Sequence, residues 1–334
     1  MTVRLGVIGV GLIGEDHVRR LTTVVDGASV TAVTDVDSGR ADAVAKQYGV
    51  PAVHASGEAL IADPAVDAVV VASWGPTHER YVLAGIAAGK PVFCEKPLAT
   101  TREACERVLA AETAAGRRLV QVGFMRRYDS SYRDVKAAVA AGSAGVPLLA
   151  HMAHRNPAVP PTVTSEDAIN DSAVHEIDVT RWLLGEEITS VLVLAPRRSS
   201  QAPAILQDPM VVMFRTASGV LVDDELGLNV RYGYDIRCEV VCETGQARLP
   251  AGDPVPPDWR VRFSDAYDAE FRAWVADVAE GNPPSGPGSW DGYAATVVAG
   301  ACVSALHSGE WTDVALPERP DLYRPDAQPS GGRP

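Results

Sequence analysis

Two groups of residues in this sequence have types and spacing suited to acid–base chemistry, and the first surrounds Lys96. Lys96 stands in the triplet Glu95-Lys96-Pro97, directly after a short apolar run that predicts a buried strand. A lysine at such a strand end can donate a hydrogen bond to a hydroxyl or carbonyl oxygen of a bound molecule. In most proteins a lysine before a proline is simply a surface residue, so the triplet alone does not establish a site.

The second group is Asp171 and His175, which lie four residues apart in the stretch Asn170–Leu184 that predicts a helix. Residues four apart share a face of an α-helix, so the two side chains are expected to point the same way. Histidine titrates near neutral pH, and a histidine oriented by a carboxylate can accept the proton of an alcohol. The same pattern fits a surface pair, or a core histidine satisfied by Asp178.

A glycine-rich turn near the start of the chain predicts a dinucleotide-binding site. The apolar run Val3–Ile8 leads into the spacing G-x-G-x-x-G, which permits a tight turn, close approach of a pyrophosphate and close packing of the next helix. Asp35 ends the second predicted strand at the offset where a carboxylate reaches the ribose hydroxyls (35 − 14 = 21). The residues expected to contact the cofactor here are Gly9, Gly11, Leu12, Ile13, Gly14 and Asp35.

Asp35 also favours NAD over NADP, because a 2′-phosphate would lie beside its negative charge. No basic residue follows it directly, the nearest being Arg40.

Strand-like and helix-like runs alternate up to about residue 122, which predicts an α/β domain with a parallel sheet. Ligands of such sheets bind beyond the carboxyl ends of the strands. Five residues at those ends are therefore also expected near the cofactor: Ser73, Trp74, His78, Glu95 and Lys96.

From residue 123 on, strand-like runs follow one another directly, the last of them at Trp259–Phe263, and Tyr232 and Tyr234 are expected on one strand face. This predicts an α+β domain with a large open, mostly antiparallel sheet. The expected domains are 1–122 and 123–334, and about 20 residues at the end, rich in Pro and Gly, are expected to form a weakly ordered tail.

The composition narrows the possible functions. The 334 residues carry a formal net charge of −13, which argues against nucleic acid or an anionic membrane as a partner. No stretch approaches the ~18 apolar residues of a membrane span and no leader is recognised, so the cytoplasm is expected. Five cysteines without a C-x-x-C pair suit reduced thiols. His151, His154, Asp171 and His175 make zinc conceivable, but nothing completes the ligand set, and no metal is expected.

Together these residues resemble the Gfo/Idh/MocA family of nicotinamide-dependent oxidoreductases and, within it, the bacterial inositol 2-dehydrogenases. The resemblance covers nearly the whole chain except the tail. The stretches that carry it are G-V-I-G-V-G-L-I-G, S-W-G-P-T-H-E, C-E-K-P-L-A-T, G-F-M-R-R-Y-D, A-H-R-N-P, V-H-E-I-D, Y-G-Y-D-I and W-D-G-Y.

The resemblance implies roles for particular residues. Lys96 would polarise the reacting oxygen, Asp171 would orient His175, and His175 would take the hydroxyl proton. Other substrate contacts would come from Asn156 and Tyr234, with Arg126 or Arg127 near the pocket mouth. The family implies a Rossmann domain that binds NAD, and a homotetramer joined through the open faces of the second-domain sheets.

The resemblance implies NAD-dependent oxidation of a cyclitol. The first choice of substrate is myo-inositol, which would be oxidised to 2-keto-myo-inositol. A sugar dehydrogenase or keto-sugar reductase of the same family is a second possibility, since it would keep Lys96 and His175 and change the ring contacts. A third is a regulator that senses the dinucleotide without chemistry. Such a protein is expected to lose the lysine or the histidine, and this sequence has both.

Overall fold

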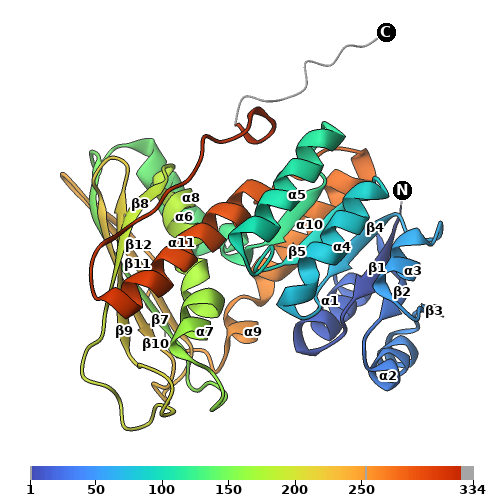
Figure 1. Cartoon of the computed structure of the whole chain (residues 1–334), viewed down its shortest axis with the longest axis horizontal. Helices are drawn as coiled ribbons and strands as arrows, with labels where there is room; N and C mark the ends of the chain where they lie inside the picture. Colours follow the sequence, from blue (N-terminus) through green and yellow to red (C-terminus); the bar gives the residue numbers. More distant parts are fainter. Residues whose placement is uncertain (1, 253, 325–334) are drawn as a thin grey trace. The chain divides into compact units, whose positions relative to one another are not determined.

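The chain forms two compact units, which the computed structural model in Figure 1 describes over residues 2–252 and 254–324. Among the described residues, unit 1 comprises residues 2–123, the segment Glu270–Ala294 and residues 316–324. Unit 2 comprises Phe124–Ala269 and Ala295–Ala315. The first border of unit 1 lies at Gly123, and its two later segments lie within the range 123–334.

Unit 1 is built on a six-stranded sheet in the order β3-β2-β1-β4-β5-β6, and every pair in it is parallel. This is the strand order of a doubly wound dinucleotide-binding fold. Helix α1 packs beside α2, while α3, α4 and α5 pack one against the next. The strands are β1 (Val3–Ile8), β2 (Ala28–Thr34), β3 (Ala52–Val53), β4 (Ala68–Val71), β5 (Val92–Glu95) and β6 (Val120–Gly123). The helices are α1 (Leu12–Thr23), α2 (Ser38–Tyr48), α3 (Gly57–Ala62), the 3₁₀ turn η1 (Gly75–Thr77), α4 (His78–Ala87) and α5 (Arg102–Ala115).

Local signals in the sequence explain these elements. Strands β4 and β5 are apolar nearly throughout and wholly buried, as expected where helices cover both faces of a parallel sheet. The Asp37 side chain caps α2 by accepting from the Arg40 amide, and the Thr101 hydroxyl caps α5 by accepting from the Ala104 amide.

The core of unit 1 is completed by a helix far along the chain. Phe271, Trp274 and Val275 of α10 (Ser264–Glu280) pack in one buried cluster with Val7 and Phe93. Phe and Trp each bury a large apolar area, so these side chains contribute strongly to this core.

The last described segment is also placed in unit 1. In the 3₁₀ turn η4 (Asp321–Tyr323), the buried Tyr323 hydroxyl donates to Glu112 Oε2 at 2.7 Å. The weakly ordered tail expected from the sequence is therefore wrong up to Arg324, and its remainder, residues 325–334, lies outside the described residues.

Unit 2 is built on a seven-stranded sheet in the order β12-β11-β7-β10-β9-β8-β13. Among its described pairs, β7 and β10 are parallel and the others antiparallel, which confirms the mostly antiparallel sheet. The strands are β7 (Pro147–Arg155), β8 (Ile188–Leu194), β9 (Met210–Thr216), β10 (Leu221–Gly227), β11 (Asp235–Cys242), β12 (Gln246–Arg248) and β13 (Thr312–Asp313). The helical elements are η2 (Met125–Tyr128), α6 (Ser130–Ala141), α7 (Ser165–Ala168), the π-helical turn η3 (Ile169–Ala173), α8 (Val174–Leu184), α9 (Trp259–Arg262) and α11 (Ser289–Ser308), whose residues up to Ala294 belong to unit 1.

Two expectations for unit 2 are wrong. Trp259–Arg262 is a short helix and not a strand, because Asp258 caps it by accepting from the amides of Arg260 and Val261. Tyr232 and Tyr234 precede β11 and do not share a strand face: Gly233, at φ 143°, turns the chain between them, so Tyr232 is 54% exposed and Tyr234 is 3% exposed.

Candidate active site

The glycine turn after β1 leaves room for a ligand at the start of α1. A Cβ on Gly9 would lie 2.5 Å from Ser73 Cα, and one on Gly14 would lie 2.0 Å from Gly9 O, so both positions require glycine. A Cβ on Gly11 would meet no described atom within 4 Å, so the space above this residue is open. The described residues supply no side-chain cap for α1, whose first N–H groups can therefore bind a pyrophosphate. Leu12 is exposed there and Ile13 half-buried.

Asp35 is fixed at the carboxyl end of β2. Its Oδ2 accepts from the Val10 amide at 2.8 Å, and its Oδ1 accepts from the Asp37 amide at 2.9 Å. The position fits a carboxylate that binds ribose hydroxyls. Arg40 reaches back from α2, and its Nη1 lies 3.3 Å from Asp35 Oδ1. A basic group therefore does lie beside Asp35, although none follows it in sequence.

The segment after β4 contains one exposed ring and one buried ring. Trp74 is 77% exposed, and the Ser73 hydroxyl is hydrogen-bonded to the Thr77 hydroxyl at 2.7 Å. His78 is buried, with Nδ1 2.7 Å from Pro97 O and Nε2 2.8 Å from Ser73 O. His78 is expected near the cofactor from the sequence, and both of its ring nitrogens face backbone carbonyls.

Lys96 follows β5 and is joined to Pro97 by a cis peptide bond. The preceding Glu95 is buried: its Oε1 lies 2.7 Å from His17 Nε2, and its Oε2 accepts from the Lys96 amide at 3.2 Å. Burial by itself would raise the pKa of Glu95, but the hydrogen bond from His17 and the charge of Lys96 outweigh it, so this pKa is lowered. Glu95 was expected to contact the cofactor, and its carboxylate is instead occupied by these protein groups.

In unit 2, Asp171 and His175 stand at the junction of two kinds of helix. The expected single α-helix over Asn170–Leu184 is interrupted, because Asp171 lies in the π-helical turn Ile169–Ala173, where the Val174 amide donates back to Ile169 O. The α-helical spacing assumed for the pair therefore does not hold across this turn. Asp171 is exposed and His175 is buried at the start of α8. π-helical turns inside α-helices are frequent at functional sites.

Next to His175, the buried side chains of Arg126, His154, Glu176 and Tyr234 form one polar network. The Arg126 guanidinium, 1% exposed, donates to Glu176 Oε1, and its Nη2 lies 3.2 Å from His154 Nδ1. His154 Nδ1 is also 3.0 Å from Glu176 Oε2, and its Nε2 lies 3.4 Å from the Tyr234 hydroxyl. The His154 and His175 ring centroids are 6.4 Å apart.

These contacts change the expectation for the two arginines. Arg126 is enclosed by unit 2 rather than exposed at a pocket mouth, since its positive charge compensates the buried Glu176. Arg127 donates to both carboxylate oxygens of Asp178, at 2.9 and 2.5 Å. Asn156 follows β7 and is held by its backbone. Its backbone N–H donates to Gly227 O at 2.8 Å, and its backbone carbonyl accepts from the Val230 N–H at 3.0 Å.

Sequence reasoning missed the roles of His154 and Glu176. The alternation along β7 carried a signal for His154, because Ala150, Met152 and His154 share its buried face. Nothing local identified Glu176 as the partner of Arg126, which is 50 residues earlier in the chain. No helix in the described part of the chain is long and apolar enough to cross a membrane.

Comparison with known proteins decides the family. Residues 3–124 match the Gfo/Idh/MocA oxidoreductase family with an NAD-binding Rossmann fold, and residues 132–248 match the Gfo/Idh/MocA C-terminal domain. The chain belongs to the Gfo/Idh/MocA family. This Gfo/Idh/MocA protein is thus an oxidoreductase that uses NAD, and the open turn at Gly11 and the fixed carboxylate of Asp35 fit that cofactor.

Relatives of this Gfo/Idh/MocA protein match it over nearly its full length. Inositol 2-dehydrogenase 3 of Saccharopolyspora erythraea is 55% identical, covering 97% of this chain and 98% of the relative. Inositol 2-dehydrogenase of Acidothermus cellulolyticus is 52% identical with the same coverage. The crystal structure of myo-inositol dehydrogenase from Lactobacillus casei in complex with NAD(H) and myo-inositol has a TM-score of 0.95 at 36% identity and covers 97% of this chain and 100% of that one.

Proposed function

We propose that this chain oxidises one secondary alcohol of a cyclitol with NAD, and that myo-inositol, giving 2-keto-myo-inositol, is the substrate. The observation that carries the proposal is the 55% identity, over 97% of the chain, to a relative named inositol 2-dehydrogenase. The crystal structure with the TM-score of 0.95 supports it, because that enzyme is in complex with NAD(H) and myo-inositol.

Three residues carry the chemistry in this proposal. NAD, when bound, supplies the acceptor for the hydride. His175 accepts the hydroxyl proton, Asp171 orients the imidazole, and Lys96 donates a hydrogen bond to the reacting oxygen as its C–O bond becomes a carbonyl. The alcohol must lose its proton as the hydride leaves, so a base and a donor acting on one oxygen are the groups the reaction needs.

Asn156 and Tyr234 bind other hydroxyls of the ring in this proposal. Tyr234 is suited to a fixed contact, because His154 lies against its hydroxyl and is itself held by Glu176. Arg126 and Arg127 support α8 through Glu176 and Asp178 and do not touch the substrate.

Specificity for a polyol follows from the polarity of the proposed contacts. A site built to hydrogen-bond hydroxyls rejects analogues that lack them by large factors, because its own polar groups would be left unpaired. Steroids and simple alcohols are therefore expected to be poor substrates, and glucose, with a similar ring of hydroxyls, a weaker one.

We also propose a homotetramer. One face of the unit 2 sheet leaves side chains such as Val211 and Met213 half-exposed, and Leu194 of β8 is 45% exposed. An antiparallel sheet with apolar side chains on an uncovered face favours association with a second copy. Five buried free thiols support the cytoplasm as the compartment.

A substrate panel tests the function. Purified protein is incubated with NAD and, in turn, myo-inositol, scyllo-inositol, glucose, xylose and glycerol, and the absorbance of the reduced cofactor is followed. We expect the highest kcat/KM with myo-inositol. An aldose oxidised at least ten times more efficiently than every cyclitol would replace this proposal with the sugar dehydrogenase. Light scattering at micromolar concentration tests the tetramer, which a monomeric mass would refute.

A further inference from the structure

The residues on both sides of Lys96 are each held by a buried histidine from a different helix of unit 1. His17 of α1 contacts the Glu95 side chain, and His78 of α4 contacts the Pro97 carbonyl. Neither histidine has a place in the acid–base chemistry proposed above. Both rings are almost fully buried, which is unusual for histidine unless its nitrogens are paired.

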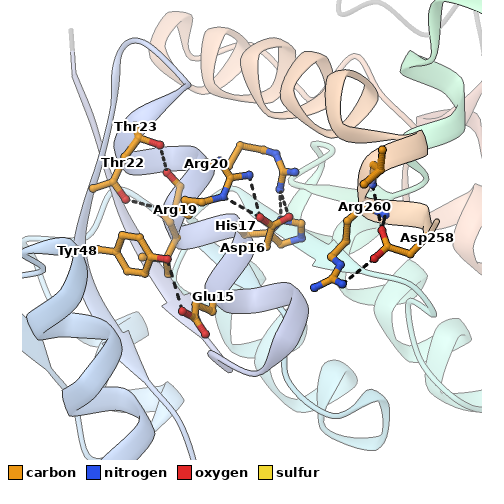
Figure 2. Close-up of polar contacts among 12 residues, drawn as sticks. Glu15, Asp16, His17, Arg19, Arg20, Thr22, Thr23, Tyr48, Asp258 and Arg260 are labelled. Atoms are coloured by element: carbon orange, nitrogen blue, oxygen red, sulfur yellow. Dashed lines mark hydrogen bonds and ion pairs between the residues drawn. The ribbon is translucent and has the colours of Figure 1, made fainter. Parts of the chain in front are cut away.

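His17 is itself fixed in orientation. Arg20 bridges Asp16 and His17 (Figure 2): its Nη1 lies 3.0 Å from Asp16 Oδ2 and 3.3 Å from His17 Nδ1. A guanidinium can only donate, so His17 Nδ1 accepts, and Nε2–H is left to donate to Glu95. The ring also packs edge-on against Phe271, with 4.7 Å between centroids.

Glu95 passes this constraint to the backbone of Lys96. Its Oε1 faces His17 at 2.7 Å, and its Oε2 accepts the Lys96 amide at 3.2 Å. The carboxylate packs closely against β6, since a Cβ placed on Gly123 would lie only 3.1 Å from Oε2. Glu95 is thus confined between β6, His17 and the amide of Lys96.

His78 constrains the following residue. Its Nδ1 lies 2.7 Å from Pro97 O, and its Nε2 lies 2.8 Å from Ser73 O at the end of β4. A neutral imidazole has one N–H and can donate to only one of these carbonyls, whereas the doubly protonated ring donates to both. A ring that carries a proton on Nδ1, whether neutral or doubly protonated, ties the Pro97 carbonyl to α4, and only the doubly protonated ring also binds the neighbouring strand end at Ser73.

We propose that His17 and His78 are positioning residues for Lys96, which fix the backbone on either side of it and so aim its ammonium group at the reacting oxygen. The inference rests on the role given to Lys96 in the proposed function. The geometry matters because a misplacement of about 1 Å in a reacting group can cost ~10²-fold in rate. A side chain that contacts a reacting group keeps its position only when the residues that support it are themselves fixed by packing and hydrogen bonds.

Substitutions that keep one ring nitrogen at a time give a direct test. His17→Gln retains a donor where Nε2 faces Glu95, whereas His17→Asn does not. His78→Asn retains a donor where Nδ1 faces Pro97, whereas His78→Gln retains only the one facing Ser73. His54→Asn is the matched control, because His54 is a histidine of unit 1 that pairs with Asp63 at 2.9 Å and does not contact the Lys96 segment.

The first readout is amide hydrogen exchange of the peptide 94–100, which does not depend on catalysis. We expect exchange to be at least tenfold faster in His17→Asn and His78→Gln, and less than threefold faster in His17→Gln and His78→Asn. The exchange rate in His54→Asn should equal that of the wild type. Exchange unchanged in His17→Asn and His78→Gln would overturn the inference. If exchange rises over the whole chain in His17→Asn and His78→Gln, these variants are impaired in folding. The comparison is then made within each Gln/Asn pair, and equal exchange of peptide 94–100 in the two members of a pair would overturn the inference.

The second readout separates this inference from the proposed function. In the wild-type background, His17→Asn should lower kcat about tenfold or more. In the Lys96→Ala background, the same substitution should lower kcat less than twofold further, because the effects of residues that act as one unit are not additive. NAD affinity by calorimetry should stay within about threefold of wild type. Equal losses in both backgrounds would overturn the positioning role. Full activity of Lys96→Ala would instead refute the role of Lys96, while the exchange result still decides whether the histidines hold the segment.

Discussion

The guanidinium of Arg40 lies beside the carboxylate of Asp35, with 3.3 Å between Nη1 and Oδ1. The carboxylate is the group that disfavours a 2′-phosphate, and repulsion between two such charges at ~4 Å is about 4 kcal/mol at an effective dielectric of ~20, before screening. Arg40 is half-exposed and also lies 3.5 Å from Asp37 Oδ2, so it offsets part of that repulsion.

We therefore expect NAD to be preferred, with a preference that Arg40 weakens. Arg40→Gln should weaken NADP binding about tenfold, corresponding to ~1.4 kcal/mol, and leave NAD binding nearly unchanged. Asp35→Asn should reduce the ratio between the affinities for NAD and NADP. Calorimetric titration of both cofactors measures these affinities, with Arg117→Gln as a control because Arg117 donates to Gly89 O, in the connection between α4 and β5. Equal or tighter NADP binding by Arg40→Gln would contradict the expectation.

Lys96 and His175 should affect the chemical step far more than cofactor binding. General acid–base groups contribute ~10²–10⁴-fold, so Lys96→Ala and His175→Ala should each lower kcat by about that factor. Lys90→Ala is the matched control, since Lys90 donates to the Asp63 carbonyl and carries no proposed role. Stopped-flow measurement of reduced cofactor under single-turnover conditions isolates this step. Retention of more than half of the wild-type rate by either variant would show that the assigned role is wrong.

Removing one member of the Arg126–Glu176 pair should destabilise the fold more than replacing both members with apolar residues. Removing one partner of a buried ion pair leaves an uncompensated charge and typically costs about 3–5 kcal/mol. Arg126→Met and Glu176→Leu should each lower the free energy of unfolding by this amount. The double variant should lose much less than the sum of the two. Urea denaturation followed by circular dichroism measures the cycle, and additive losses would contradict a direct coupling.

Asp224 should make stability depend on pH. Both of its carboxylate oxygens are buried without a hydrogen-bond partner among the described residues, and burial, together with the negative charge of Glu176, raises its pKa well above the ordinary value. Between the unfolded pKa, about 3.9, and this raised value, the folded chain keeps a proton that the unfolded chain has lost. The free energy of unfolding therefore falls as pH rises, by up to ~1.4 kcal/mol per pH unit for this group.

Asp224→Asn removes that titration. Its stability relative to wild type should increase steadily from pH 5 to pH 8, as measured by urea denaturation at four pH values. A difference between the two proteins that stays constant over this range would show that Asp224 does not titrate as expected.

The sequence predicted the sheet of unit 1 well, because its signals are local. A continuous apolar run such as Val3–Ile8 and the glycine motif behind it define a strand and a turn without any distant partner. The position of Asp35 followed from the same motif. Arg40 was misjudged because closeness in sequence was taken for closeness in space, although one helical turn of α2 is enough to bring it back.

Features that depend on distant or non-local contacts were not predictable. The π-helical turn at Ile169–Ala173 arises from a shift in hydrogen bonding, which no residue in it specifies. Trp259–Phe263 is a different case, because it alternates as a strand does and the local capping by Asp258, which outweighs that pattern, was overlooked. The burial of Arg126 depends on Glu176, and a side chain paired across 50 residues cannot be distinguished from an exposed one by its neighbours in sequence.

The discontinuity of unit 1 has a consequence for synthesis on the ribosome. Phe93 of β5 packs against Phe271, with 4.3 Å between ring centroids, and against Trp274, with 5.6 Å. Phe271 is translated 178 residues after Phe93 (271 − 93 = 178). The sheet can form early, but its apolar surface at Phe93 stays uncovered until most of unit 2 has emerged. During that interval the nascent chain presents a hydrophobic surface of the kind that chaperones bind and that promotes aggregation.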